Sequence, residues 1–255
     1  MQESRGPRAV STNQEDIFEN LEKVVRKYAL SSYLRPIADH TREAFAQAKA
    51  FVGKFYEGRD TAHKVILDSG CGTGESTLRI AKQFPGIPVI GIDKSVVRLA
   101  KAGNTRQLAN AQQASNCTAA LPANAFWVRA ELLDFWRLAL DEVSAGHWQI
   151  PYHAVFYPNP WPKQSEATRR FHLHPIFPTL ISLADTTELR TNWEIYAREF
   201  AEAARVFKGL SDKGRADNMT VVCEVFSPDI PETAFERKYK EARQQLWRVI
   251  IKKLG

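Results

Sequence analysis

An apolar run meets three alternate glycines in Val65-Ile66-Leu67-Asp68-Ser69-Gly70-Cys71-Gly72-Thr73-Gly74. Glycine lets a backbone leave a strand through a tight turn and approach a ligand closely. A second apolar run, Ile90-Gly91-Ile92, ends on Asp93, whose carboxylate can accept hydrogen bonds from ribose hydroxyls. Together the two stretches predict parallel strands with a nucleotide-like ligand at their carboxyl ends.

Glu75 narrows the class of ligand. The dinucleotide fingerprint G-x-G-x-x-G requires glycine at this position, so that a pyrophosphate can rest on the N-terminus of the following helix. A carboxylate at that helix end repels phosphate. The sequence therefore favours a nucleotide-like ligand that lacks phosphate, and an ordinary glycine-rich turn between a strand and a helix is the alternative.

Length and composition describe one soluble α/β protein. The 255 residues are 44% apolar and 25% charged, and no apolar stretch approaches the ~20 residues of a membrane-spanning helix. Residues 1–13 are polar and contain no hydrophobic signal region. Cys71, Cys117 and Cys223 form no C-x-x-C pair, which argues against a disulfide framework and a thiolate metal site. We therefore expect a cytoplasmic protein with no metal ion and no membrane partner.

Alternating apolar runs and helical patterns predict a mostly parallel sheet with helices on both faces. The expected strands are Lys64–Leu67, Val89–Ile92, Ala125–Val128, His153–Tyr157, Met219–Phe226 and Leu246–Ile251. The expected helices are Gln14–Ala29, Ile37–Phe55, Thr77–Phe84, Ser95–Ala114 and Thr233–Gln245. Two of these helices precede the glycine loop, so we expect a helical N-terminal extension over residues 1–60 and one core domain over residues 61–255.

Positive charge is concentrated toward the C-terminus. The formal net charge is +6, and residues 232–255 hold seven basic against three acidic side chains. Such a surface suits a polyanionic partner such as nucleic acid. A solvated helix face explains the same residues equally well.

A proline-rich segment, Tyr157-Pro158-Asn159-Pro160-Trp161-Pro162-Lys163, begins where the fourth strand is expected to end. Ligands of open α/β sheets bind at the carboxyl ends of strands. Proline fixes φ and removes a backbone donor, so three prolines predict a stiff, extended loop. This loop can hold Asn159 and Trp161 against a planar substrate, although prolines also end strands and Trp161 would fit a core.

Four motifs, in order, resemble the TrmB-type tRNA (guanine-N7)-methyltransferases. The proline loop is similar to their P-D-P-W-P-K signature, and Arg169-Arg170 is similar to the basic pair that follows it. The segment Thr191-Asn192-Trp193-Glu194, with Tyr196-Ala197, is similar to T-D-W-E-x-Y-A. The segment Thr233-Ala234-Phe235-Glu236 is similar to the terminal T-K-F-E element. The spacing D-x-G-x-G-x-G likewise resembles the S-adenosylmethionine loop of class I methyltransferases. The resemblance runs from Leu67 to the C-terminus and implies a class I, Rossmann-like methyltransferase fold.

The resemblance implies a role for each matching residue. S-adenosylmethionine would bind at Asp68, Gly70, Cys71, Gly72, Gly74, Asp93, Lys94, Ala130, Glu131 and Asn159. The tRNA substrate would contact Trp161, Lys163, Arg169, Arg170, Asn192, Thr233 and Glu236, with His172 and His174 extending a phosphate-binding strip. Asn159 would be the catalytic residue and orient the acceptor nitrogen. T-x-x-E is also a helix capping box, so Thr191–Glu194 and Thr233–Glu236 have that structural alternative.

Asn159 and Asn192 depart from the family pattern, which has aspartate at both positions. An amide keeps an acceptor oxygen but loses the charge and adds donors. The segment Leu180–Leu189 also lacks the K-P-G-G turn usual before the T-D-W strand. Asn159-Pro160-Trp161 is in part similar to the N-P-P-Y-type loop of amino-group methyltransferases.

The sequence as a whole predicts an S-adenosylmethionine-dependent methyltransferase that acts on N7 of a guanosine in tRNA. The alternatives are N-methylation of a small heterocycle or amino group on the same core, and a non-catalytic relative that binds RNA or the cofactor. Salt-dependent binding of tRNA would separate the RNA enzyme from a small-molecule enzyme, because phosphate contacts release counterions. Cofactor binding without turnover would identify the non-catalytic relative.

Overall fold

The structure, a computed structural model, describes residues 10–57, 62–101, 122–210 and 219–254. Contacts divide the chain into two units: Arg35–Ala154, which we call the glycine-loop unit, and Met1–Leu34 with Val155–Gly255, which we call the proline-loop unit. Of the helices predicted for the N-terminal extension, α1 (Leu21–Ala29) belongs to the proline-loop unit and α2 (Asp39–Phe55) to the glycine-loop unit. The predicted boundary at residue 60, between a helical N-terminal extension and the core domain, does not coincide with the division into these units and stays a prediction.

The glycine-loop unit is built on parallel strands, as predicted. β2 (Ile66–Ser69), β3 (Val89–Asp93) and β4 (Ala125–Arg129) pair in parallel, with Ile66 opposite Val89 and Val89 opposite Ala125. The order is β4-β3-β2-β6, and β6 (Tyr152–Phe156) passes from this unit into the other. The two-residue strands β1 (His63–Lys64) and β5 (Trp148–Gln149) form a separate parallel pair.

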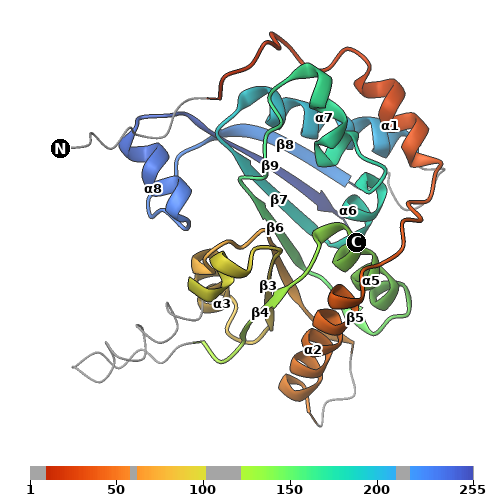
Figure 1. The fold of residues 1–255 in the computed structure, drawn as a ribbon, viewed down its shortest axis with the longest axis vertical. Coiled ribbons are helices and arrows are strands. Elements are labelled where there is room, and N and C mark those ends of the chain that lie inside the picture. The colour runs from red at the N-terminus through yellow and green to blue at the C-terminus, as the bar shows by residue number, and fades with distance from the viewer. Residues whose placement is uncertain (1–9, 58–61, 102–121, 211–218, 255) are drawn as a thin grey trace. The chain divides into compact units, whose positions relative to one another are not determined.

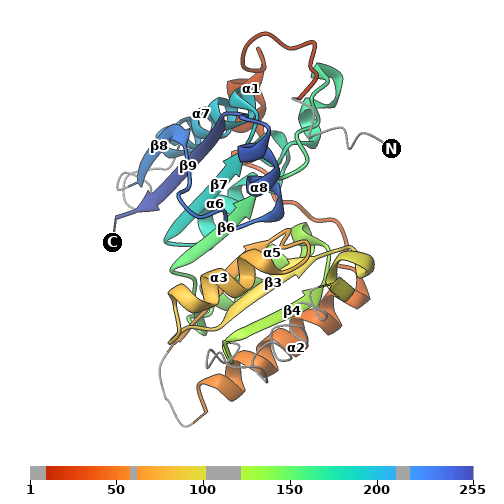
Figure 2. The ribbon, with the colours of Figure 1, turned by 90° about the vertical axis from the view of Figure 1, so that its left-hand side faces the viewer.

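Helices cover both faces of these strands. Phe126 and Trp127 are neighbours on β4, so their side chains point to opposite faces. Phe126 stacks on Phe51 of α2 with 4.8 Å between ring centroids. Trp127 lies beside Thr77 of α3 (Glu75–Gln83), because both would touch a Cβ built on Gly91 of β3. The layers formed by α2, the strands and α3 can be followed in Figure 2.

Two further helices follow β3 and β4 in this unit. Residues 96–101 are helical and begin the predicted helix Ser95–Ala114, whose remainder lies outside the described residues. α5 (Leu132–Ser144), which the sequence patterns did not reveal, packs on α2 and β5. Its buried Trp136 donates from Nε1 to Ser69 Oγ at 2.8 Å, so a hydrogen bond fixes α5 to the end of β2.

The proline-loop unit carries antiparallel strands. Its order is β6-β7-β9-β8, with β7 (Thr186–Thr191), β8 (Met219–Phe226) and β9 (Leu246–Lys253). β9 runs antiparallel to β7 and to β8. α7 (Glu194–Leu210) packs on these three strands, and α1 packs on α7 and α6 (Phe177–Leu183), as Figure 1 shows. The short 3-10 helices η1 (Gln164–Arg169) and η2 (Phe171–Leu173) lie between β6 and α6.

Several predicted elements have different bounds in the structure. The helix expected from Gln14 begins only at Leu21, because Gln14 and Phe18 bond to the distant Glu199 instead. The strand expected at Lys64–Leu67 is divided at Val65 between β1 and β2. α8 (Ala234–Glu241) ends before the predicted Gln245, since Arg243 takes a left-handed φ of 52°. Among the helices of the described ranges, none is long and apolar enough to cross a membrane.

Gly91→Ala tests the packing of α3 on β3. A Cβ there would lie 2.5 Å from Thr77 Oγ1 and 2.7 Å from Trp127 Cδ1, closer than atoms in contact allow. We expect the free energy of unfolding to fall by about 1–3 kcal/mol, the usual cost of overpacking, when measured by urea denaturation. Gly53→Ala is the control, because Gly53 lies inside α2 with no described atom within 4 Å of a built Cβ. There the substitution should raise stability by about 0.5–1 kcal/mol, and equal stability of the two variants would contradict the packing.

Candidate active site

The glycine loop leaves β2 through three left-handed residues. Gly70, Gly72 and Gly74 have φ values of 78°, 58° and 78°, a region that residues with a Cβ rarely adopt. The backbone N–H groups of Gly70 and Cys71 donate to the carbonyl of Ile92 at 2.7 and 3.1 Å, which ties the loop to β3. A Cβ built on Gly70 meets no described atom within 4 Å, so this side of the loop is open for a ligand.

Asp68 fixes the loop to the helix that follows it. Its Oδ2 accepts hydrogen bonds from Ser76 Oγ at 2.7 Å and from Thr77 Oγ1 at 2.6 Å, both in the first turn of α3. The residue is 1% exposed. Asp68 therefore shapes the loop from inside the unit, and the direct cofactor contact expected of it stays a prediction.

Asp93 holds the same loop from the end of β3. Its Oδ2 accepts from the Gly72 N–H at 3.0 Å, and its Oδ1 accepts from the Ser95 N–H at 2.7 Å and from Arg98 Nη2 at 3.0 Å. A carboxylate offers about four lone-pair positions, so Oδ2 keeps capacity for one more bond beside these three. Asp93 thus fixes the loop and keeps one acceptor position; it is 2% exposed, about as buried as Asp68, so its bond to a ligand hydroxyl likewise stays a prediction.

Apart from Asn159, whose predicted cofactor contact stays a prediction, the other predicted cofactor residues lie in the glycine loop or at strand ends. Lys94 and Glu131 are exposed, whereas Ala130 is buried. The Ala130 N–H donates to the Asp93 carbonyl at 3.2 Å, which places the end of β4 beside the end of β3. Burial, reinforced by the charge of Asp68, raises the pKa of the Cys71 thiol, so the thiol stays protonated and does not act as a nucleophile at neutral pH.

These groups suit a nucleoside better than a nucleotide. The Asp93 carboxylate matches ribose hydroxyls, and the open glycine backbone allows a ligand to approach closely. Glu75 in the first turn of α3 opposes a phosphate. The residues therefore fit S-adenosylmethionine, which has a ribose and no phosphate. Within the described ranges, no cluster of His, Cys, Asp and Glu side chains is arranged to hold a metal ion.

The proline loop contains two strained residues, one at its start and one near its end. Tyr157 and Trp161 have positive φ values of 51° and 46°, a conformation that costs about 1–3 kcal/mol for a residue other than glycine. Between them lies Asn159, which is exposed. Asn159 Oδ1 accepts a hydrogen bond from the Trp161 N–H at 3.4 Å. The amide oxygen therefore helps to turn the loop.

Lys163 and Arg169 are the exposed cations of this region. Lys163 directly precedes η1. The Arg169 side chain is 58% exposed, and its guanidinium lies 4.5 Å from the centroid of the Trp161 ring. It also pairs with Glu166 at 3.3 Å. A guanidinium over an indole presents a positive, planar surface of the kind that binds the bases and phosphates of single-stranded RNA.

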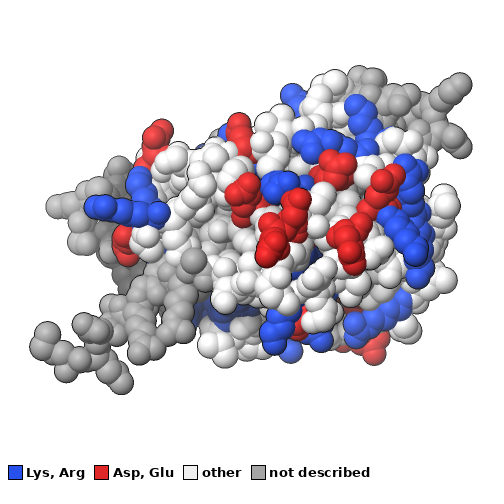
Figure 3. Space-filling view, turned by 90° about the horizontal axis from the view of Figure 1, so that it is seen from above, with Lys and Arg blue, Asp and Glu red and all other residues white. Residues whose placement is uncertain are grey.

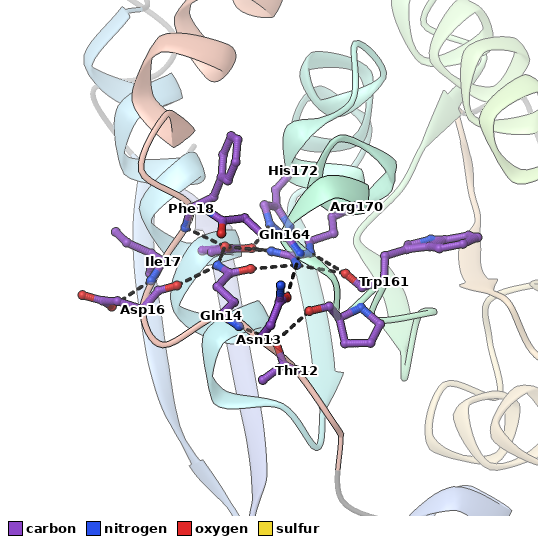
Figure 4. A network of polar contacts seen from close by, with 12 residues as sticks. Thr12, Asn13, Gln14, Asp16, Ile17, Phe18, Trp161, Gln164, Arg170 and His172 are labelled. Atoms are coloured by element: carbon purple, nitrogen blue, oxygen red, sulfur yellow. Dashed lines mark hydrogen bonds and ion pairs between the residues drawn. The ribbon is translucent and has the colours of Figure 1, made fainter.

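Arg170 is buried, which corrects its predicted role as a phosphate contact. Its side chain is 0% exposed, and Nη1 donates to both oxygens of Glu199, at 2.9 and 2.7 Å. Nε and Nη2 donate to the Trp161 carbonyl at 3.2 and 2.9 Å, and Nη2 also donates to Gln14 Oε1 at 2.9 Å (Figure 4). The guanidinium is committed to partners inside the proline-loop unit and has no face for an RNA phosphate.

His172 does not belong to a phosphate-binding strip either, because it is buried beside the same carboxylate. Its Nε2 lies 2.8 Å from Glu199 Oε2. Burial lowers the pKa of His172, so the ring is neutral and we assign the Nε2 proton to this bond. Burial disfavours the charged form of Glu199 as well, but bonds from His172 and Arg170 outweigh it and lower the pKa of Glu199 to about 2. His174 is half-buried with its ring edge-on to Tyr33.

A second buried guanidinium holds the start of the proline loop. Arg190 Nη1 and the Tyr157 hydroxyl donate to the same oxygen, Glu236 Oε1, at 2.9 and 3.1 Å. The Tyr157 N–H donates to the Arg190 carbonyl at 2.8 Å. The rings of Phe156 and Phe226 enclose the Arg190 guanidinium, at 4.0 and 4.5 Å from their centroids. The first residue of the loop is therefore fastened to β7 and to α8.

Thr233 and Glu236 form the capping box of α8. The Glu236 N–H donates to Thr233 Oγ1 at 3.0 Å, and the Thr233 N–H donates to Glu236 Oε2 at 3.3 Å. The two residues are 8% and 0% exposed. Since Glu236 also accepts from Arg190 and Tyr157, its carboxylate is used inside the unit, and its contact with the target guanosine stays a prediction without support from this geometry.

The second T-x-x-E sequence forms no capping box. Thr191 is the last residue of β7, and its hydroxyl accepts from the Trp193 N–H at 3.1 Å before α7 begins at Glu194. Asn192 lies between them, and its Nδ2 donates to Gln244 Oε1 at 3.1 Å. The amide of Asn192 thus connects the end of β7 to the segment after α8.

Sequence reasoning missed Glu199 and Gln14, which hold Arg170 in place. Glu199 had a usable signal: it lies three residues after Tyr196 and next to Phe200, on the face of α7 that is buried. A carboxylate is rarely fully buried unless it is paired, so this position indicates a buried cation. Gln14 had no such signal, because a glutamine in a predicted amphipathic helix is ordinary.

The charges on the face drawn in Figure 3 are mixed, with Lys and Arg standing among Asp and Glu. Some of the C-terminal basic residues have acidic or backbone partners within the proline-loop unit. Arg248 pairs with Glu224, and Lys240 Nζ lies 3.3 Å from the Asp229 carbonyl. The basic excess read from the sequence is therefore partly used within the protein.

Known proteins match this chain over most of its length. Residues 62–249 match the Methyltransf_4 family, described as "Putative methyltransferase". A tRNA (guanine-N(7)-)-methyltransferase of Neisseria meningitidis serogroup C is 27% identical over 194 residues, 74% of this chain and 72% of that protein. A protein of the same name from Mycobacterium avium is 36% identical over 107 residues, 42% of this chain and 35% of that protein.

Among solved structures, the crystal structure of the 16S rRNA methyltransferase KamB shares the fold. Its TM-score is 0.51 at 14% identity, over 88% of this chain and 97% of that chain. Because the family match spans well over half of the sequence, the chain belongs to the Methyltransf_4 family and is an S-adenosylmethionine-dependent methyltransferase.

Proposed function

We propose that this enzyme transfers the methyl group of S-adenosylmethionine to N7 of a guanosine in tRNA. One observation carries the proposal: Asn159 is exposed in a strained loop that buried guanidinium groups fasten on either side. A loop held in this way suits a reaction whose main demand is orientation. The substrate class comes from the tRNA (guanine-N(7)-)-methyltransferases that are 27% identical to the chain over 194 residues and 36% identical over 107 residues.

Guanine N7 needs alignment and no general base. Its lone pair is free, so the nitrogen can attack a sulfonium methyl group in line; the N–CH3 bond forms as the S–CH3 bond breaks, and the positive charge moves to the base. The amide of Asn159 neither gives nor takes a proton near neutral pH, but its oxygen and NH2 group can orient the base. An amide stabilises the developing charge less than aspartate would.

In this proposal the glycine-loop unit holds the methyl donor. Asp93 accepts a hydrogen bond from a ribose hydroxyl, and the backbone at Gly70 and Gly72 allows close approach. S-adenosylmethionine supplies an already activated methyl group when it is bound. Lys94 and Glu131 are exposed beside the ends of β3 and β4, where they can contact the amino-acid or base portion of the donor.

In the proline-loop unit, Trp161, Lys163 and Arg169 are the residues proposed to bind tRNA. The stacked pair of Arg169 and Trp161 offers a base a planar surface, and Lys163 adds a phosphate contact. Arg170 is not among them, because its guanidinium is buried. With tRNA as the substrate, we propose that the enzyme acts in the cytoplasm.

Asp93→Asn tests the cofactor role of the acid at the end of β3. The amide can accept only through one oxygen, so bonds to ribose hydroxyls and to the loop are weakened. We expect isothermal calorimetry to show a loss of about 1–3 kcal/mol in S-adenosylmethionine binding, the scale of hydrogen bonds to a charged group. Arg98→Gln is the control, because it removes the 3.0 Å ion pair with Asp93 and keeps the carboxylate. Equal affinity of Asp93→Asn and wild type would remove Asp93 from the site.

Asn159→Ala tests the proposed orienting residue and, with wild type, the reaction itself. Purified enzyme, labelled donor and total tRNA are incubated, and the labelled nucleoside is mapped; wild type should yield 7-methylguanosine. The alanine variant should lower kcat by about tenfold to a hundredfold and cofactor affinity far less, since it removes an orienting contact. Asn159→Asp should retain activity, because a carboxylate can still accept from the Trp161 N–H and adds charge. Label in a small heterocycle and none in tRNA would refute the proposed substrate.

Arg169→Gln tests the proposed RNA contact against a matched surface arginine. We expect weaker tRNA binding and a salt dependence of log Kd that is shallower by about one counterion, with cofactor affinity unchanged. Arg205→Gln is the control: Arg205 is also exposed and also pairs, at 3.2 Å, with a glutamate three residues earlier, but it lies on α7. If the two variants bind tRNA alike across salt concentrations, Arg169 has no special part in binding.

A further inference from the structure

The proline loop depends on donors from outside itself. Pro158, Pro160 and Pro162 have no N–H, so the loop has few backbone hydrogen bonds with which to keep its shape. Its carbonyls are held by side chains instead. The Trp161 carbonyl accepts two bonds from Arg170, and the Pro162 carbonyl accepts one from Thr12 Oγ1 at 2.6 Å. The left-handed φ of Trp161 requires such support, because an unsupported residue would relax to a more favourable conformation.

A short N-terminal segment contacts the end of the loop, the first residue after it and the Arg170 side chain that holds it. We call Thr12–Gln14 the N-terminal clamp. Thr12 donates to the Pro162 carbonyl, Asn13 Oδ1 accepts from the Gln164 N–H at 3.3 Å, and Gln14 Oε1 accepts from Arg170 at 2.9 Å (Figure 4). The clamp therefore forms hydrogen bonds directly with Pro162 and Gln164, and it contacts Trp161 indirectly, through Arg170.

The clamp is anchored in the core by a different set of bonds. Gln14 Nε2 and the Phe18 N–H donate to Glu199 Oε1 at 2.6 and 2.8 Å. Gln14 is 7% exposed, whereas Thr12 and Asn13 are exposed. Thr12 and Asn13 thus contact the loop segment directly, whereas Gln14 anchors the clamp in the core. Thr12 Oγ1 also accepts from the Gln14 N–H at 3.0 Å, so a change at Thr12 removes this backbone bond but keeps the side-chain bonds of Gln14 to Glu199 and Arg170.

We propose that the N-terminal clamp positions the proline loop for methyl transfer, with Thr12 and Asn13 as positioning residues. The inference rests on the proposed function of that loop. When the two bonds are lost, the backbone at Pro162 and Gln164 loses its fixed points, and Trp161 gains freedom. Asn159 follows, because its Oδ1 is bonded to the Trp161 N–H. In-line attack tolerates little displacement, so turnover suffers more than binding.

The double variant Thr12→Val/Asn13→Ala removes both exposed supports and leaves Gln14, Arg170 and Glu199 unchanged. We expect kcat for tRNA methylation to fall about tenfold, with KM for tRNA within about twofold of wild type and cofactor affinity unchanged. Thr12→Ser/Asn13→Asp, which restores the donor and the acceptor, should recover most of kcat. The control is Thr220→Val, which removes another exposed hydroxyl that bonds a distant carbonyl, that of Lys252 at 3.5 Å, and should retain wild-type kcat.

Hydrogen–deuterium exchange measures how well the backbone N–H groups of the loop are protected, and it needs no substrate. The N–H groups of Trp161 and Gln164 have acceptors in Asn159 and Asn13. Peptides that cover residues 157–166 should exchange several times faster in the double variant than in Thr220→Val, while peptides of α7 stay unchanged. Unchanged exchange in the double variant overturns the clamp, and so does faster exchange with wild-type kcat. Faster exchange in an enzyme whose wild type methylates no tRNA supports the clamp and refutes the proposed function instead.

Discussion

The buried ion pair between Arg170 and Glu199 is the contact on which the proline-loop unit depends. Neither side chain is exposed, and removal of one partner from such a pair costs about 3–5 kcal/mol because a desolvated charge is left behind. Gln14 and the Phe18 N–H, Trp161 and His172 supply further donors and acceptors, from three separate parts of the chain. A buried pair adds little net stability, but in this unit it can be satisfied only when these three segments come together in one arrangement.

This constraint explains how a strained loop can persist. Tyr157 and Trp161 keep positive φ values because Arg190 and Glu236 hold the first residue and Arg170 holds the second. The strained backbone of the loop is thus held at one end by the Arg190–Glu236 cluster and at the other by the Arg170–Glu199 cluster, both within one unit. Methylation of a nitrogen with a free lone pair requires orientation above all, so a stiff loop is a suitable place for the residue that orients it.

In the glycine-loop unit, two carboxylates hold the glycine loop and the start of α3 in place. Asp68 accepts two hydroxyl bonds from α3, and Asp93 accepts two backbone bonds and one from Arg98. Three left-handed glycines give the loop its turn, and the two acids prevent it from moving. The proline-loop unit works differently: amides stand at Asn159 and Asn192, and the buried charges of Arg170, Arg190 and Glu236 hold the loop from behind.

The sequence by itself determined the features that arise from local geometry. Glycines at alternate positions predicted the loop after β2, and the apolar run Met219–Phe226 predicted β8. The sequence T-x-x-E offered a capping box as the alternative to substrate contact at two places, and the structure forms it at Thr233 and Glu236 alone of these two. Tertiary structure alone decided between Arg169 and Arg170, because adjacent arginines have the same chemistry and only the position of Glu199 on α7 makes one of them a core residue. It likewise decided that Gln14 leaves its predicted helix, since a buried carboxylate offers its amide a partner that a solvent-facing helix does not.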